Sequence, residues 1–503
     1  MSSRYRYEEL ASFITLLVSN GTLEPGTKVP SLRQISRQRQ ISISTALQAY
    51  RLLEDRSVIE ARPQSGYYVA RGSGKSAREA VIAAAPGLST DRTVGNRSDV
   101  SRLLECAADP AIVPLGCAVP SARLLAAARL DRFLARAARL AGDRHNRYTV
   151  PKGDLRLRRA IARRALRWGQ ALSAEDIVIT TGCTEALTLA LQMVARPGDA
   201  IAVESPTHFG VLNALAALDM KPHELPTDSR TGVDLSALAG ALECGTVRAC
   251  LFSSSFNNPL GFTLTNERKV ALLQLLATHQ VPLIEDDIYG DVHFGRERPT
   301  PFAALDPHGN TLYCSSFSKT VAPGYRIGWI ATRRYVDRVL ERKLAFTLTG
   351  PALPQAALAE FLSTGGYESH LRRLRRTFEV AIGQVARTIA MTFPQGTRVT
   401  RPRGGYLLWV ELPRPLRSRD LFERALAQGI CFAPGDIFSA SGRYGNCLRL
   451  SCGHAWSLST EQALTKLGKM ASALLAGEPA TEPTAPTPHA PGRHGTEHGT
   501  DLR

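Results

Sequence analysis

Short apolar runs that alternate with helical patterns are the feature of this 503-residue sequence that most limits how it can fold. The runs include DIVITTG, DAIAVE, VRACLFSSS, VPLIEDD, TLYCSSFS and RIGWIAT. Parallel strands that are covered by helices on both faces are apolar throughout, and each needs a helical crossover to its neighbour. The alternation therefore predicts an α/β domain with a mostly parallel sheet over residues 113–475.

A smaller unit precedes this domain, and segments of other composition flank it. Residues 1–71 combine periodic apolar segments, helix punctuation and a strand pair, which predicts a separate compact unit. Residues 72–112 are rich in Ala, Ser, Gly and Arg without a sustained period, so we expect a linker with room for a short helix near residues 101–106. The tail, residues 476–503, is rich in Pro, Thr, His and Gly, and we expect it to be disordered.

Charge, hydropathy and cysteine usage exclude some classes of protein. The formal net charge of +17, from 62 Lys and Arg against 45 Asp and Glu, favours polyanionic partners, although an Arg-rich genome gives the same excess. No apolar run approaches the ~20 residues of a membrane span, and the amino terminus lacks a signal-peptide core, so we expect a cytoplasmic protein without a membrane partner. Nine scattered cysteines without a Cys-x-x-Cys pair predict reduced thiols and no metal site.

Two predicted helices near the amino terminus have the spacing of a helix-turn-helix. Ser31 and Gln34 form a capping-box pattern at the start of the first helix, and Ser42 can cap the second. The predicted apolar stripe of the second helix consists of Ile43, Ala46, Leu47, Tyr50 and Leu53. The segments VIEAR and YYVA then predict a two-stranded wing, whose flanking Arg62 and Arg71 could reach phosphates.

The run GTLEPGTKVPSLRQIS, followed by ISISTALQAYRLLEDRSVIEARPQSGYYV, resembles the GntR-type winged helix over nearly all of residues 5–70. The resemblance implies binding to double-stranded DNA, and hence a location on the nucleoid when DNA is bound. It also implies roles for single residues. Arg33 and Arg37 would lie near the DNA backbone, Ser42, Ser44, Thr45 and Gln48 would lie at the major groove, and Gly66 would let the wing turn tightly.

Four segments of the predicted α/β domain carry side chains that suit one cofactor. A strand end, a glycine turn and a helix start at residues 179–186 could hold a phosphate. The predicted strand TLYCSSFS ends at Lys319, with Arg326 seven residues further on. Carboxylates end another strand at residues 285–287, and a polar turn lies at residues 257–261. A lysine able to form a Schiff base, with hydroxyls and an arginine nearby, suits a phosphorylated aldehyde.

The order and spacing of these segments resemble fold-type I pyridoxal phosphate enzymes, the aspartate aminotransferase superfamily. The resemblance implies a large domain with a parallel or mixed sheet, a smaller α/β subdomain, and pyridoxal 5'-phosphate as cofactor. Lys319 would form the Schiff base, Asp286 would pair with the pyridine nitrogen, and Arg449 would bind a substrate carboxylate. Residues implied at the phenolic oxygen are Asn258 and Tyr289, and those implied at the phosphate are Gly182, Cys183, Thr184, Ser316, Ser318 and Arg326.

Two positions need separate treatment. His208 lies where the family usually has an aromatic residue stacked on the cofactor ring, so the sequence departs from the pattern there. Tyr148 matches a tyrosine that reaches the phosphate of the other subunit, which implies a homodimer. Simpler interpretations stay open: Tyr148 could be an ordinary core residue, Arg449 could pair with a surface acid, and Cys183 could contribute its backbone alone.

Fusion of a GntR-type winged helix to an aminotransferase-like domain resembles the MocR subfamily of bacterial transcriptional regulators, apart from the tail. The resemblance implies that pyridoxal phosphate, or an amino compound condensed with it, is an effector that controls DNA binding. A competing interpretation is an active aminotransferase with an appended DNA-binding domain, because every residue that transamination needs is present. A third is a protein that senses the cofactor and uses no amino ligand.

Overall fold

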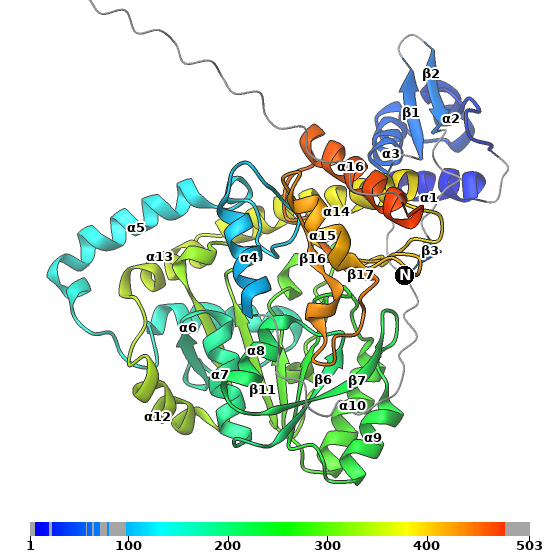
Figure 1. Cartoon of the computed structure of the whole chain (residues 1–503). Coiled ribbons are helices and arrows are strands. Elements are labelled where there is room, and N and C mark those ends of the chain that lie inside the picture. The colour runs from blue at the N-terminus through cyan, green and yellow to red at the C-terminus, as the bar shows by residue number, and fades with distance from the viewer. Residues whose placement is uncertain are drawn as a thin grey trace, which may run out of the picture.

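The computed structural model describes residues 6–19, 23–56, 58–62, 65–70, 78–79 and 97–477. These residues form a winged helix, a large domain and a small domain (Figure 1). The predictions for the wing turn at residues 63–64, for Arg71 and for the tail lie outside the described residues. Within the described ranges, no helix is both long and apolar enough to cross a membrane.

The winged helix has the elements that its sequence predicts. Ser31 and Ser42 each accept a hydrogen bond from the backbone N–H three residues on, at 3.2 Å and 3.0 Å, and so cap α2 and α3. Strands β1 and β2 pair antiparallel. Ile43 departs from the prediction because its side chain is 53% exposed, while Ala49 lies in the core with Ala46. The bounds are α1 Arg6–Ser19, α2 Leu32–Arg39, α3 Ile43–Asp55, β1 Ile59–Arg62 and β2 Gly66–Val69.

An eight-stranded sheet with the order β5-β12-β11-β10-β9-β6-β7-β8 forms the centre of the large domain. All six apolar runs named above are strands of this sheet, as predicted. Strand β12 runs antiparallel to both of its neighbours, β5 and β11, while β11, β10, β9, β6 and β7 are mutually parallel. The bounds are β5 Ile177–Thr180, β6 Ala200–Ser205, β7 Lys221–Asp228, β8 Gly232–Val233, β9 Ala249–Ser253, β10 Leu283–Asp286, β11 Thr311–Ser316 and β12 Gly328–Ala331.

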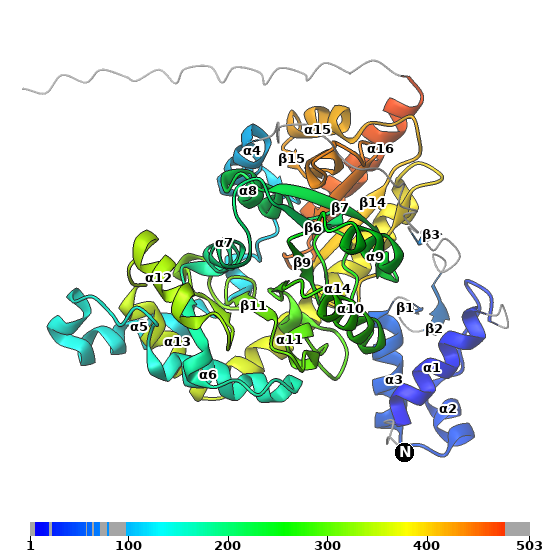
Figure 2. The same ribbon diagram turned by 90° about the horizontal axis from the view of Figure 1, so that it is seen from below.

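Helices cover the large sheet because apolar strands must be shielded from water on both faces (Figures 1 and 2). Helix α7 begins directly after β5, and its buried side chains pack with those of the central strands. The helices are α5 Ala127–Ala141, α6 Leu155–Ala165, α7 Gly182–Val194, α8 Phe209–Ala217, α9 Leu235–Glu243, α10 Asn266–Thr278, α11 Phe302–Leu305, α12 Val336–Phe346 and α13 Ala352–Ser363.

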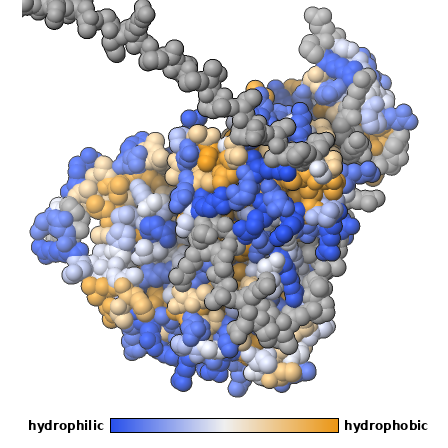
Figure 3. All heavy atoms as spheres, in the orientation of Figure 1, coloured by the Kyte–Doolittle hydropathy of each residue, from blue (hydrophilic) through white to orange (hydrophobic). Residues whose placement is uncertain are grey.

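The small domain contains a five-stranded sheet with the order β16-β17-β14-β13-β3 and a separate pair of strands, β4 and β15. Its strands are β3 Arg78–Glu79, β4 Val113–Pro114, β13 Arg398–Val399, β14 Leu407–Glu411, β15 Ile430–Cys431, β16 Ala433–Pro434 and β17 Cys447–Ser451. Its helices are α4 Arg97–Ala108, α14 Gly366–Thr392, α15 Ser418–Leu426 and α16 Leu458–Leu475. Hydrophilic residues dominate the face in Figure 3, and apolar residues gather there in separate patches.

Part of the predicted linker is packed into this small domain. Strand β3 pairs with β13, and α4 buries Leu103 and Cys106 in the same apolar cluster as β14 and β17. The short helix expected near residues 101–106 is thus a twelve-residue helix, α4. Leu103 and Cys106 are buried, whereas Leu104 of the same helix is 59% exposed, so the apolar pattern of α4 is too short to stand out in the sequence.

Polar contacts join the winged helix to the rest of the chain. Arg296 lies 3.2 Å from Glu8, and Arg376 on α14 lies 3.4 Å from Asp55 at the end of α3. Arg387 also donates to the backbone oxygen of Arg56 at 3.3 Å. The two side chains of the Arg376–Asp55 pair are 78% and 53% exposed, so water and salt screen their attraction.

Candidate functional site

The predicted cofactor residues meet where β10 and β11 end and α7 begins. Asp286 is the last residue of β10 and pairs in register with Cys314 of β11. Ser316 ends β11 and lies opposite Gly328 of β12, whose Cα faces the backbone of Gly182 at the start of α7. Parallel strands bring their carboxyl ends to one edge of a sheet, which is where open α/β sheets bind their ligands.

Glycine packing keeps a phosphate-sized cradle at this edge. Gly182 has a φ of +82°, and a Cβ on it would overlap the guanidinium of Arg326. A Cβ on Gly328 would likewise overlap the Gly182 backbone. Arg326 donates to the Thr181 backbone oxygen at 3.2 Å and so remains across the amino end of α7. Exposed Thr184 stands on the first turn of α7, and helix amides together with a guanidinium can bind a phosphate.

Hydroxyl groups border the same cradle on the β11 side. The backbone N–H of Ser318 donates to the Ser316 hydroxyl at 3.2 Å, and both side chains are buried. Cys183 is buried, and its thiol points at the Asp286 carboxylate with an S···O distance of 3.8 Å. Burial raises the pKa of the Cys183 thiol well above its usual value, so this side chain serves as a neutral neighbour of Asp286.

Lys319 and Asp286 have electrostatic properties that suit Schiff-base chemistry. Burial and the positive charge of Arg449 lower the pKa of Lys319 to about 8, while Asp286 opposes the shift. A lowered pKa provides more of the neutral amine, which is the form that attacks an aldehyde. Burial and neighbouring Asp287 raise the pKa of Asp286 to about 6, so its carboxylate is mainly charged at pH 7 and able to pair with a protonated ring nitrogen.

Arg449 is fully buried in the middle of β17. One Nη atom donates to the Asn258 side-chain oxygen at 3.1 Å, the other donates to the Gly116 backbone oxygen, and Nε has no partner among the described residues. No carboxylate within the described ranges pairs with it, so pairing with a surface acid is excluded there. A buried guanidinium with an unused donor suits a ligand carboxylate.

Asn258 and Tyr289 lie beside Arg449. Asn258 is buried and follows β9, and its side-chain oxygen already accepts the bond from Arg449. Tyr289 is 5% exposed, with its ring 5.6 Å from that of Tyr406, and burial raises the pKa of its hydroxyl. Both side chains therefore stay neutral hydrogen-bonding groups, which can hold an oxygen of a ring-shaped cofactor.

His208 lies half-buried in the site, whereas Tyr148 is exposed at the surface of the chain. Burial, with Arg449 and Lys319 nearby, lowers the pKa of His208 to about 3, so its imidazole is a flat, uncharged ring at neutral pH. Gly210 leaves room for that ring, because a Cβ there would lie 2.6 Å from it. The side chain of Tyr148 is 83% exposed, so it is not an ordinary core residue.

A buried ionic cluster behind Lys319 escaped sequence analysis. Asp291 binds Arg164 at 3.0 Å and Arg298 at 3.0 Å, and Tyr367 donates to the same carboxylate at 2.9 Å. The Tyr367 hydroxyl oxygen also lies 3.0 Å from the hydroxyl of Thr320, the residue directly after Lys319. These partners come from distant segments, so no local spacing in the sequence could have revealed them; the basic and acidic residues near Asp286 were the only hint.

The predicted DNA-contacting residues share the exposed side of the helix-turn-helix. Arg33, Arg37, Ser44 and Gln48 are exposed, whereas Thr45 is half-buried with its hydroxyl 2.7 Å from that of Ser42. Ser42 is also exposed, but its hydroxyl caps α3. Gly66 has a φ of +102°, which suits the tight start of β2. Arg62 pairs with Glu60 at 2.8 Å and stacks on Tyr68, which limits its reach toward phosphates.

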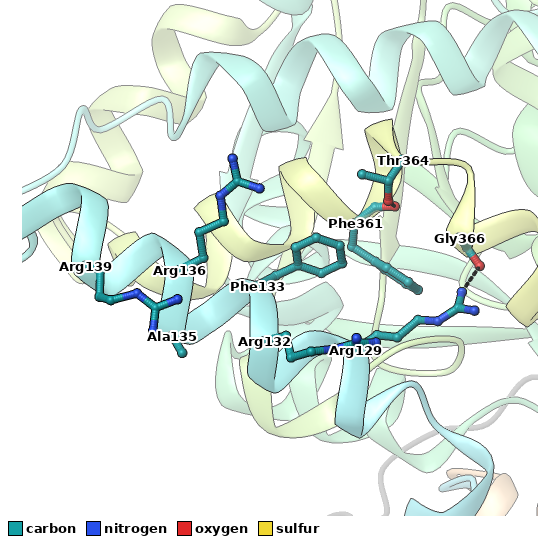
Figure 4. A pocket seen from close by; sticks show the side chains of 9 residues that line it. All are labelled: Arg129, Arg132, Phe133, Ala135, Arg136, Arg139, Phe361, Thr364 and Gly366. Carbon is teal, nitrogen blue, oxygen red and sulfur yellow. Dashed lines mark hydrogen bonds between the residues drawn. The ribbon is translucent and has the colours of Figure 1, made fainter.

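A separate groove of about 660 Å³ lies between α5 and α13 and contains none of the predicted cofactor residues. Figure 4 shows four arginine side chains from α5 around it, with Arg129 donating to the Gly366 backbone oxygen at 3.4 Å. The four are Arg129, Arg132, Arg136 and Arg139. This basic helix face was not predicted, although the i, i+3, i+7, i+10 spacing of its arginines is visible in the sequence.

Comparison with known proteins agrees with this geometry. The aminotransferase class I and II family matches residues 121–464, and the gntR family of bacterial regulatory proteins matches residues 6–69. The solved α-aminoadipate aminotransferase LysN of Thermus thermophilus, in complex with N-(5'-phosphopyridoxyl)-L-leucine, has a TM-score of 0.71 and 26% identity, covering 81% of this chain and 98% of that one. Fold and site thus define the larger part of the chain as a class I and II aminotransferase domain, a pyridoxal phosphate-dependent fold family.

Relatives along nearly the whole chain narrow the family further. The uncharacterised HTH-type transcriptional regulators YdcR and YjiR of Escherichia coli are 39% and 36% identical to this chain. Each alignment covers 92% of this chain and 98% of the relative. This chain belongs to the MocR-type HTH transcriptional regulators, in which a GntR DNA-binding domain is fused to an aminotransferase domain.

The lowered pKa of His208 predicts a specific pH dependence of stability. Because the folded state disfavours the charged imidazole, His208 contributes stability that is complete above pH 6.5 and lost as the pH falls toward 3. The free energy of unfolding should fall between pH 7.5 and pH 5.5, and replacing His208 with Phe should make this fall smaller by about 1 kcal/mol. Urea unfolding of the cofactor-free protein at both pH values measures this, with exposed His308→Phe as the matched control. An identical fall in unfolding free energy in wild type and His208→Phe would contradict the conclusion that the folded state keeps His208 uncharged.

Proposed function

We propose that this chain regulates transcription by binding pyridoxal phosphate at Lys319 and by coupling that site to DNA binding through its winged helix. The observation that carries the proposal is the meeting of four side chains from separate segments, Lys319, Asp286, Asn258 and Arg326, at one edge of the large sheet. When bound, the cofactor would supply an aldehyde that condenses with amines and a ring that withdraws electrons.

Different side chains of the site would hold different parts of this cofactor. Arg326, the amides and Thr184 at the start of α7, and the hydroxyls of Ser316 and Ser318 would bind the phosphate. Asp286 would hold a proton on the ring nitrogen, and Asn258 with Tyr289 would orient the phenolic oxygen. The flat, neutral ring of His208 would stack on the cofactor ring.

Arg449 points to an effector that carries both an amine and a carboxylate. The buried guanidinium has a free Nε and lies close enough to Lys319 to lower the pKa of that amine. An amino acid could therefore present its amine to the cofactor and its carboxylate to Arg449. Opposite charges that pair in a dry site bind strongly, whereas an amine without a carboxylate would leave Arg449 unpaired.

A homodimer would complete the cofactor site. Tyr148 is directed away from its own core, and apolar side chains near it in the chain are also exposed. They are Leu140 at 74%, Val150 at 64% and Leu166 at 65% exposure. A second copy that covers these residues would bury apolar area and bring Tyr148 to the partner's phosphate site. Such a dimer would present two winged helices to DNA, in the bacterial cytoplasm and on the nucleoid.

The cofactor assignment predicts a yellow protein with absorbance near roughly 420 nm, typical of a Schiff base. Lys319→Ala should abolish this absorbance, because no other lysine is expected to reach the aldehyde. Arg449→Ala is the matched control. It should keep the absorbance while weakening the binding of amino acids by about 1.5 to 3 kcal/mol. Spectral titration measures both effects. A wild-type protein that stays colourless at saturating cofactor would refute the proposal, and steady conversion of a 2-oxo acid would favour the aminotransferase interpretation.

Different residues of the winged helix should control the affinity for DNA and the preference for a DNA sequence. Arg33→Ala should weaken binding to specific and random duplexes alike and reduce the salt dependence of that binding, because a phosphate contact is lost. Gln48→Ala should mainly reduce the difference in binding free energy between the specific and the random duplex. The reduction should be about 1 to 3 kcal/mol if the amide forms two hydrogen bonds with one base. Salt-controlled titration of the full-length protein measures both. Equal effects of the two substitutions on both duplexes would contradict these roles.

A further inference from the structure

A short segment of the small domain binds both cations of the proposed ligand site. Residues 115–118, here named the strap, follow β4 and lead into the large domain. The Lys319 amine donates to the backbone oxygen of Ala118 at 2.6 Å, and Arg449 donates to the backbone oxygen of Gly116. Tyr406 donates to the same Ala118 oxygen at 2.9 Å. Each of two strap carbonyls therefore accepts a hydrogen bond from a cation that an amine- and carboxylate-bearing ligand would bind, while the Nε of Arg449 has no partner among the described residues.

The strap is packed tightly against α4. The Cys117 thiol donates to the backbone oxygen of Leu103 at an S···O distance of 2.9 Å, and Leu103 is 1% exposed. A Cβ on Gly116 would lie 2.8 Å from a Leu103 methyl and 2.9 Å from the Cys431 sulfur. Since no space separates the strap from Leu103, the strap cannot shift toward α4 unless α4 shifts as well.

Helix α4 is held on its outer side by weaker contacts. Arg102 makes a two-point pair with Glu423 of α15 at 2.8 and 2.9 Å, and it lies 5.2 Å from the Phe422 ring centre. The side chains of the pair are 37% and 52% exposed, and exposed pairs stabilise a structure little. Along the chain, α4 follows the segment that connects it to the winged helix. Strand β3, which pairs with β13 of the small domain, and residues outside the described ranges lie along that connection.

We propose that the strap is displaced when ligand occupies Lys319 and Arg449, and that α4 transmits this displacement to the segment that carries the winged helix. The effector class is an amino acid joined to the cofactor, because this combination engages both cations at once. The inference rests on the proposed function, and it adds the structural element through which the ligand site controls DNA binding. The two-state element is the strap with α4, and the ligand biases it by competing for two donors.

Thiol labelling tests the displacement in the full-length protein. The probe is N-(5'-phosphopyridoxyl)-L-alanine, which combines the phosphate, ring, amine nitrogen and carboxylate in one stable molecule. Cys117 is 8% exposed, and the probe should raise its rate of reaction with N-ethylmaleimide by about five-fold or more, as read by mass spectrometry. Exposed Cys244 is the control and should react at an unchanged rate. Bound probe with an unchanged rate at Cys117 would overturn the proposal.

Glycine substitutions test the coupling to DNA. In Gly116→Ala the new methyl group has no room beside Leu103, so the DNA affinity without probe should shift toward the value of wild type with probe. Gly240→Ala is the matched control, since nothing lies within 4 Å of the added carbon. If Gly116→Ala does not fold, Cys117→Ala replaces it: the response to probe should shrink and Cys117→Ser should restore it.

The outcomes separate the two proposals. If the probe binds to wild type and leaves its DNA affinity unchanged, the proposed function is wrong. If wild type responds while Gly116→Ala behaves like Gly240→Ala, or Cys117→Ala keeps the full response, the strap proposal is wrong and the proposed function stands.

Discussion

Lys319 and Arg449 are two cations that lie together in the ligand site with little negative charge to offset them. Lys319 and Arg449 both have lowered pKa values because burial disfavours their charged forms, and each lowers the pKa of the neighbouring His208 further. Asp286 is the carboxylate that favours the charged form of Lys319. A site of this kind gains most from a ligand that brings its own anions, as a phosphorylated cofactor joined to an amino acid does.

The same constraint explains why the strap lies where it does. Backbone carbonyls accept one hydrogen bond each from Lys319 and Arg449, but they bring no net charge to offset either cation. A carboxylate at Arg449 would add an attraction between opposite charges that a neutral carbonyl lacks, so a ligand can compete for that donor. The winged helix contacts the remainder through exposed ion pairs such as Arg376 with Asp55, which hold its position weakly. Small shifts in the small domain can therefore change how the winged helix meets DNA.

Local patterns in the sequence predicted much of this architecture. Each apolar run became a strand, and the caps at Ser31 and Ser42 are formed, because these features depend on residues a few positions apart. The sequence also predicted that Asp286 and Lys319 lie close together, because the parallel strands that precede them, β10 and β11, end at the same edge of the large sheet. Ile43 was assigned to the core on period alone, but its side chain at the start of α3 is 53% exposed. The strap and the Asp291 cluster were missed since their partners, Arg449 and Tyr367, lie far away in the chain.

If occupancy of the cofactor site changes DNA binding, linkage makes the change directly measurable. DNA from the chain's own promoter region would be titrated with cofactor-free protein, with pyridoxal phosphate, and with pyridoxal phosphate plus a panel of amino acids, at one salt concentration. The account predicts that at least one condition shifts the DNA dissociation constant by about five-fold or more, and that DNA shifts the affinity for that ligand by the same factor. Equal DNA affinity in all three conditions, with the cofactor visibly bound, would contradict it.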